Sequence, residues 1–139
     1  MDSNALVNGQ LDGGSRLLAA LSDAGVEIVV GFWTKLTEAS GWNLYLASPA
    51  VETKEGSHRA YGSLLRILTQ MPELEIDSDD VLFVDVDDAM AVEAVAVVKP
   101  KDANAKPYTG VTRFRGSVFG GLEIDGAYIY PPPRTAVTA

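Results

Sequence analysis

The stretch VEIVVGFW at residues 26–33 and the stretch GWNLYLAS at residues 41–48 decide the expected fold. The first is rich in β-branched and aromatic residues, which favour a strand. The polar segment between the two stretches is short enough for a β-hairpin. The second stretch alternates between two faces, with Trp42, Leu44 and Leu46 on one and Asn43, Tyr45 and Ala47 on the other.

An amphipathic helix follows this hairpin. Apolar residues recur at helical spacing and predict a buried face made of Tyr61, Leu64, Leu65 and Leu68. Arg59 and Arg66 would lie on its outer flank. The helix should end at Met71, because the proline that follows disfavours helical geometry in the residue before it.

Two other helices are expected from less regular patterns. Ser15 can cap a short helix, and Gly25 is placed to end it. Residues 89–99 are ambiguous, because the alanines and Glu93 favour a helix whereas the valines favour a strand. An aspartate just before this segment is a good helix cap, so we expect a helix there.

The segment from residue 111 to residue 130 should be strand-like. Two turn signals, Asp125-Gly126 and Gly120-Gly121, compete to be the tip of one hairpin. We expect strands at residues 112–117 and 127–130. Together with a short apolar strand at residues 81–84, these segments predict an α+β fold. It would be a single-layer sheet of about five strands, mostly antiparallel, with two or three helices packed on it.

The 139 residues fit one domain. Residues 1–13 are expected to form a flexible leader and residues 132–139 a disordered tail, which leaves one globular domain at residues 14–131. The chain has no cysteine, which excludes disulfides and thiolate chemistry. The sequence also shows no signal peptide and no apolar stretch long enough for a bilayer, so we expect a cytoplasmic protein without a membrane partner.

The charge of the chain opposes nucleic-acid binding. The formal net charge is −8 at pH 7, whereas binding through phosphate contacts needs a basic patch. Arg113 and Arg115 are the best local candidates for such contacts, and two arginines are too few against that charge. We therefore expect no nucleic-acid partner.

Carboxylates gather around the expected strand at residues 81–84. Hard cations such as Mg²⁺ take oxygen ligands, so a metal-dependent hydrolase or phosphoryl-transfer enzyme is one hypothesis, with Asp85, Asp87 and Asp88 as candidate ligands. The simpler interpretation is that residues 77–80 form a solvated turn and that Asp87 or Asp88 caps a helix. Under that interpretation there is no catalytic residue, metal or cofactor. The full acidic set is Asp77, Asp79, Asp80, Asp85, Asp87 and Asp88.

The first strand predicts an interface. Its residues should alternate, with Val26, Ile28, Val30 and Phe32 on one face and Glu27, Val29, Gly31 and Trp33 on the other. The second face is too apolar for full exposure, and the expected helices can cover only one face of the sheet. Val29, Trp33 and Tyr45 should then need a partner, most simply in a symmetric homodimer.

Parts of the chain resemble a family of short uncharacterised bacterial proteins of unknown function. The resemblance lies in Gly31-Phe32-Trp33, residues 42–49, Gly120-Gly121 and residues 124–131. It implies a fold shared by small stand-alone proteins and assigns no activity or site residue. The leading hypothesis is a small stand-alone binding or interaction domain, self-associating or bound to another protein. The alternatives are the metal-dependent enzyme and a small-ligand-binding regulatory domain.

Overall fold

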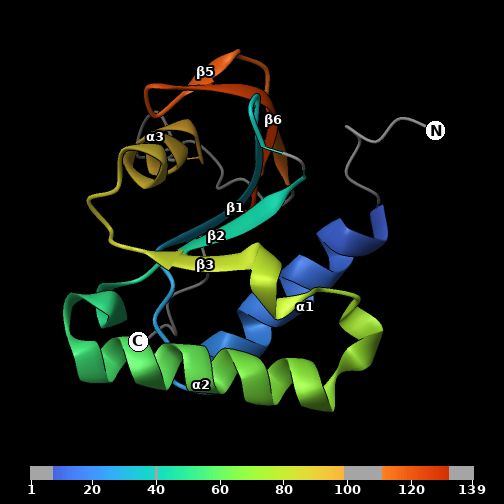
Figure 1. The fold of residues 1–139 in the computed structure, drawn as a ribbon, viewed down its shortest axis with the longest axis vertical. Helices are drawn as coiled ribbons and strands as arrows, with labels where there is room; N and C mark the ends of the chain where they lie inside the picture. The colour runs from blue at the N-terminus through green and yellow to red at the C-terminus, as the bar shows by residue number, and fades with distance from the viewer. Residues whose placement is uncertain (1–7, 40, 99–110, 132–139) are drawn as a thin grey trace, which may run out of the picture.

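The computed structural model describes residues 8–39, 41–98 and 111–131, in which three helices flank a mixed sheet (Figure 1). The strands follow the order β3-β2-β1-β6-β4, and β5 pairs with β6; every pair is antiparallel except β2 with β3. The α+β class is therefore confirmed. The strands are β1 (Val30–Leu36), β2 (Asn43–Ala47), β3 (Val81–Val84), β4 (Thr112–Phe114), β5 (Val118–Phe119) and β6 (Leu122–Ile129). The helices are α1 (Asn8–Asp23), α2 (Lys54–Gln70) and α3 (Ala89–Val98), with 3-10 turns η1 (Pro49–Glu52), η2 (Pro72–Leu74) and η3 (Ser78–Asp80).

Helices cover both faces of the sheet. In Figure 1, α1 and α2 lie on one side of the strands, and α3 lies on the other side. Each face has its own apolar core: Trp33 and Leu44 belong to the core under α1 and α2, and Phe32 and Tyr45 to the core under α3. The expectation that the helices could cover only one face is therefore wrong.

The hairpin of β1 and β2 confirms the alternation predicted for residues 41–48. Leu44 and Leu46 pack under α1 and α2, whereas Tyr45 and Ala47 pack under α3. In the antiparallel register Trp33 lies opposite Leu44, and both side chains belong to the core under α1 and α2. The side chains of this hairpin therefore alternate between the two apolar cores.

The first strand begins four residues later than predicted. A bend at Val29 precedes β1, and the chain changes face there. Val26 and Ile28 consequently pack under α1 and α2, whereas Val30 packs under α3. The predicted common face of these residues is wrong, because strand alternation applies only from Val30 onward.

The first helix begins earlier than predicted. α1 starts at Asn8 rather than near Ser15, so residues 8–13 belong to it and not to a flexible leader. Gly13 and Gly14 lie inside this helix, against neighbouring parts of the chain. A Cβ at Gly13 would collide with the Leu74 carbonyl, and one at Gly14 with the Tyr130 hydroxyl. The glycines therefore allow close packing of the helix. Residues 1–7 and the expected tail at 132–139 lie outside the described residues.

The second turn signal, Gly120-Gly121, forms the hairpin of β5 and β6. Both glycines have positive φ, 59° and 84°, as a tight turn between such strands requires. Asp125-Gly126 instead lies inside β6, at an irregularity opposite Lys35. The Asp125 carboxylate accepts a hydrogen bond from the Lys35 Nζ at 2.7 Å, and that buried lysine fixes the bulge. The strand expected at residues 112–117 is longer than the observed β4. The strand expected at residues 127–130 is shorter than the observed β6.

The two later helices match their predicted positions. α2 ends at Gln70, just before Met71, and α3 is a helix as expected. The buried side of α2 is rotated from the predicted one, because Leu65 is 53 % exposed while Ala60, Leu64 and Ile67 are buried. None of the helices in the described part of the chain is long and apolar enough to cross a membrane.

Candidate functional site

The aspartates around β3 bind the backbone of their own turns. The Asp77 carboxylate accepts the Asp79 N–H at 2.9 Å, and the Asp85 carboxylate accepts the Asp87 N–H at 3.2 Å. The Asp88 carboxylate accepts the N–H groups of Met90 and Ala91 at 3.0 and 3.2 Å, which caps α3. The predicted turn at residues 77–80 and the predicted helix cap at Asp88 are confirmed, and Asp85 forms a further turn of its own.

These carboxylates do not converge into a metal site in the described residues. Within that part of the chain, no three Asp, Glu, His or Cys side chains are grouped so that they could hold an ion. Asp85, Asp87 and Asp88 are neighbours in sequence, but Asp85 and Asp88 are directed at different backbone groups. Partial burial, and then the like charges of Asp77 and Asp79, raise the pKa of Asp80.

The residues predicted to form an interface are covered by the chain itself. Trp33 is 1 % exposed, and its Nε1 donates a hydrogen bond to the Tyr130 hydroxyl at 2.8 Å. Tyr45 is 8 % exposed and stacks on Phe32, with ring centroids 5.4 Å apart. Val29 is partly buried against the core under α3. The prediction that Trp33 and Tyr45 need a partner to cover them is wrong, because α1, α2 and α3 together cover both faces of the sheet.

An apolar surface lies instead on the outer side of α3. The helix sequence AMAVEAVAVV contains one charged residue, Glu93. Its buried side contains Met90, Ala91, Ala94 and Val98. The opposite side is exposed and entirely apolar, with Ala89, Val92 and Ala96, and Val92 is 54 % exposed. Apart from Glu93 the helix is apolar on every side, and such a helix is normally buried, so this exposed side needs an explanation.

Two further exposed leucines lie on the same side of the sheet as this helix. Leu122 is 46 % exposed and lies opposite the buried Phe119 in the hairpin, so its side chain is on the α3 side. Leu82 is 38 % exposed and lies beside Tyr45 in the parallel register, which also places it on the α3 side. We define the α3 face as Leu82, Ala89, Val92, Ala96 and Leu122.

The hairpin that holds Leu122 is attached to α3. The Glu93 carboxylate accepts the Gly120 N–H at 2.6 Å. Gly120 packs so tightly on Met90 that a Cβ there would come within 2.6 Å of the Met90 backbone nitrogen. Together with the Asp88 cap, these contacts hold the hairpin against the N-terminal part of α3.

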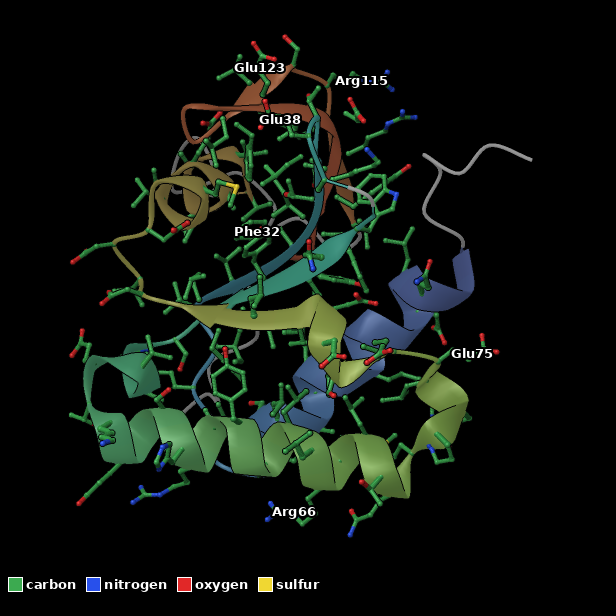
Figure 2. The ribbon with its side chains drawn as sticks, in the orientation of Figure 1. Phe32, Glu38, Arg66, Glu75, Arg115 and Glu123 are labelled. Atoms are coloured by element: carbon green, nitrogen blue, oxygen red, sulfur yellow. The ribbon has the colours of Figure 1, made fainter. Side chains whose placement is uncertain are left out.

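The chain that leads into α3, and α3 itself, carry negative charge. From Met71 to Val98 the chain has nine Asp or Glu residues and no Lys or Arg. Among the described residues, the basic side chains Lys54, Arg59 and Arg66 are exposed on α2, whereas Lys99, Lys101 and Lys106 follow α3 outside the described residues. Figure 2 shows Arg66 on the outer side of α2, which lies across the sheet from α3.

Comparison with protein-family models, with curated proteins and with solved structures finds no match for this chain. The sequence analysis did not single out Val92, Leu82 or Leu122. One signal was present in the sequence: residues 89–98 have no polar side, and this lack of amphipathicity also made the segment ambiguous between helix and strand.

Proposed function

We propose that this chain is a non-catalytic binding domain that docks a protein partner on its α3 face. The observation that carries the proposal is Val92, which is more than half exposed on a helix without a polar side. Covering apolar surface is favourable by about 25 cal/mol per Å². Apolar patches rimmed by polar residues mark interaction sites more often than isolated exposed side chains do.

The contacts that hold the hairpin on α3 support a binding role. The Asp88 cap and the bond between Glu93 and Gly120 hold the helix and hairpin in one arrangement. A preformed surface loses little conformational entropy when a partner binds, so more of the burial energy appears as affinity.

The matched pair Val92 and Leu65 allows a direct test. Both are about half exposed on helices, but they lie on opposite sides of the sheet. A photo-crosslinking amino acid is placed at one or the other position, and the protein is expressed in its own host. We expect position 92 to capture one partner that position 65 does not capture.

The captured partner is then purified and its dissociation constant measured. Val92→Ser should weaken binding about tenfold, whereas Leu65→Ser should leave it unchanged. If the partner is a second copy of the chain, light scattering will also detect a dimer, and the α3 face remains the binding surface. Equal capture at both positions, or no effect of Val92→Ser, would show that the α3 face does not bind a protein.

A further inference from the structure

The exposed side of α2 is a second candidate surface, and it lies on the other side of the sheet from α3 (Figure 1). We propose that this side of α2 docks a helical protein segment with acidic side chains. This docking is independent of the α3 face. It rests on a glycine that no packing contact requires, on two arginines without ion pairs and on an exposed leucine. We define the α2 face as Arg59, Gly62, Leu65 and Arg66.

Gly62 lies in the middle of α2, where the fold gives no reason for a glycine. Glycine disfavours the interior of a helix relative to alanine. Gly56, near the start of the same helix, is explained by packing, because a Cβ there would collide with the Ala50 carbonyl oxygen. A Cβ at Gly62 would have nothing within 4 Å, and the φ of Gly62 is not positive. The glycine instead leaves a notch on the exposed side of α2, where a second backbone can approach closely.

Two exposed arginines flank this notch. Arg59 lies three residues before Gly62 and Arg66 four residues after it, so all three lie on one side of the helix. Within the described residues neither guanidinium group has an ion pair, whereas Arg16 and Lys35 each pair with a carboxylate. Helix α2 contains three lysine or arginine residues and one acidic residue, and the chain on both sides of it is described. The α2 face therefore presents unpaired positive charge on a chain whose net charge is −8.

The spacing of the two arginines indicates the form of the partner. Arg59 and Arg66 are seven residues apart, which is two turns and about 10 Å along the helix axis. Carboxylates seven residues apart on a second helix have the same spacing, and each can accept hydrogen bonds from one guanidinium group. Leu65 is 53 % exposed beside the notch and offers the same helix an apolar contact. An acidic helix that runs along α2 thus satisfies both arginines and covers the leucine.

The charge of the whole chain disfavours other anionic occupants. A nucleic acid or an anionic membrane extends beyond a patch about 10 Å long, and the acidic remainder of the chain then repels it. A second copy docked symmetrically through α2 would place arginines opposite arginines, and like charges across an interface are costly. A short acidic helix interacts mainly with the α2 face, because charges farther away than about 8 Å are screened at physiological salt.

The proposal is tested with synthetic peptides and the full chain. The probe is an alanine-rich peptide of about 20 residues, long enough to form a helix alone, with glutamates seven residues apart and a leucine on the same side. One control peptide carries lysine in place of each glutamate. A second has the same composition, but its glutamates are spread around the helix. Binding is followed by amide chemical shifts of the ¹⁵N-labelled protein.

We expect the glutamate peptide to shift amides of α2 around Gly62 and to leave those of α3 in place. The peptide with spread glutamates should bind at least about fivefold more weakly, and the lysine peptide should not bind. Arg59→Gln together with Arg66→Gln should weaken binding about tenfold. Arg115→Gln, at an exposed position elsewhere on the chain, is the matched control and should leave the affinity unchanged.

Gly62→Ala separates docking from folding. Alanine favours the helix, so the melting temperature should rise by about 2–4 °C. The added methyl group fills the notch, so the affinity for the glutamate peptide should nevertheless fall at least about fivefold. Loss of binding in a stabilised variant has no explanation in misfolding.

Four results would overturn the proposal. Absence of shifts in α2 at millimolar glutamate peptide would show that no acidic helix docks there. Unchanged affinity of Gly62→Ala would show that the notch is not part of the site. Equal affinity for the peptide with spread glutamates would show general attraction between charges. Tighter binding of α2 to anionic lipid vesicles or to single-stranded DNA would show that the occupant is not a protein. None of these results bears on the α3 face, which is tested at position 92.

Discussion

The hydroxyl of Tyr61, on α2, accepts a hydrogen bond from the backbone N–H of Phe83, on the edge strand β3, at 3.1 Å. The two rings also pack edge to face, with centroids 4.9 Å apart. Two residues earlier on the same edge, the Val81 N–H bonds to the Ser78 carbonyl. An exposed edge strand invites pairing with another chain, and here these two N–H groups are satisfied within the domain. Tyr61 therefore helps to close this edge of the sheet.

Tyr61→Phe should expose the Phe83 amide without removing the ring. We expect hydrogen exchange at Phe83 to become faster and the free energy of unfolding to fall by about 1 kcal/mol, since one hydrogen bond is lost. Exchange is measured residue by residue by NMR. The amide of Leu82, in the same strand, serves as the control and should keep its rate. An unchanged rate at Phe83 would show that Tyr61 does not protect the edge.

Leu64 and Leu65 are neighbours on α2 with opposite environments. Leu64 is 1 % exposed, so Leu64→Ala should destabilise by about 2–5 kcal/mol, the range for truncating a buried leucine. Leu65→Ala should change stability by less than about 0.5 kcal/mol, as an exposed substitution does. Urea denaturation measures both. A large loss for Leu65→Ala would mean that the buried side of α2 is the one predicted from sequence.

Helix α2 shows what the spacing of apolar residues can and cannot predict. The spacing of Tyr61, Leu64, Leu65 and Leu68 correctly predicted a helix and its end at Met71. It did not locate the centre of the buried side, because Ala60 and Ile67 define an equally regular stripe that also contains Leu64. Which stripe turns inward depends on where β3 and α1 lie, and helical spacing alone does not contain that information.

The α3 face could not be predicted from the sequence, for a related reason. The pattern of residues 26–33 correctly showed that both faces of the first strand need cover, but it could not show what supplies it. Trp33 was assigned to an interface because nothing in the sequence reveals that α1 packs on it through Gly14. The exposed side of α3 emerges only once the strand order places that helix over β1.

Asp88 should contribute to stability as a cap and not as a metal ligand. Asp88→Ala removes the acceptor of two N–H groups of α3, and we expect a loss of about 0.5–2 kcal/mol. Millimolar Mg²⁺, Mn²⁺ or Ca²⁺ should leave the melting curve of the unmodified protein in place, whereas a bound ion at a hundredfold excess over its dissociation constant would add about 2.7 kcal/mol. An upward shift that Asp85→Asn abolishes would restore the metal hypothesis.

Thr34 holds a buried hydroxyl without a hydrogen-bond partner in the described structure. Thr34→Val keeps the volume and removes the polar atom, so we expect the free energy of unfolding to rise by about 1 kcal/mol. Thr37→Val, at an exposed position, is the control and should have little effect. If Thr34→Val is destabilising in thermal and urea denaturation, the hydroxyl has a partner in solution.

Tyr130 joins the last strand to the first helix through its hydroxyl. It accepts the Trp33 Nε1–H at 2.8 Å and donates to the Leu11 carbonyl at 2.7 Å. Tyr130→Phe leaves both groups without this partner, so we expect a loss of about 1–3 kcal/mol at neutral pH. In a background of Trp33→Phe the loss should be smaller, because the indole donor is then absent. Equal losses in both backgrounds would mean that the bond to Trp33 contributes nothing to stability.

The same tyrosine predicts a loss of stability at alkaline pH. Burial raises the pKa of Tyr130 above its ordinary value of 10.0; the bond from Trp33 opposes this rise, and the charge of Asp12 adds to it. The folded chain then holds the proton more tightly than the unfolded chain, so this contribution is complete below about pH 10 and declines as the pH rises further. Urea unfolding from about pH 8 to about pH 11 should show that decline. Tyr130→Phe should make this decline in stability less steep. The decline that remains should come from Tyr45, whose pKa is also raised by burial and then by Asp88. An identical slope in the variant would show that Tyr130 ionises no less readily in the folded chain than in the unfolded one.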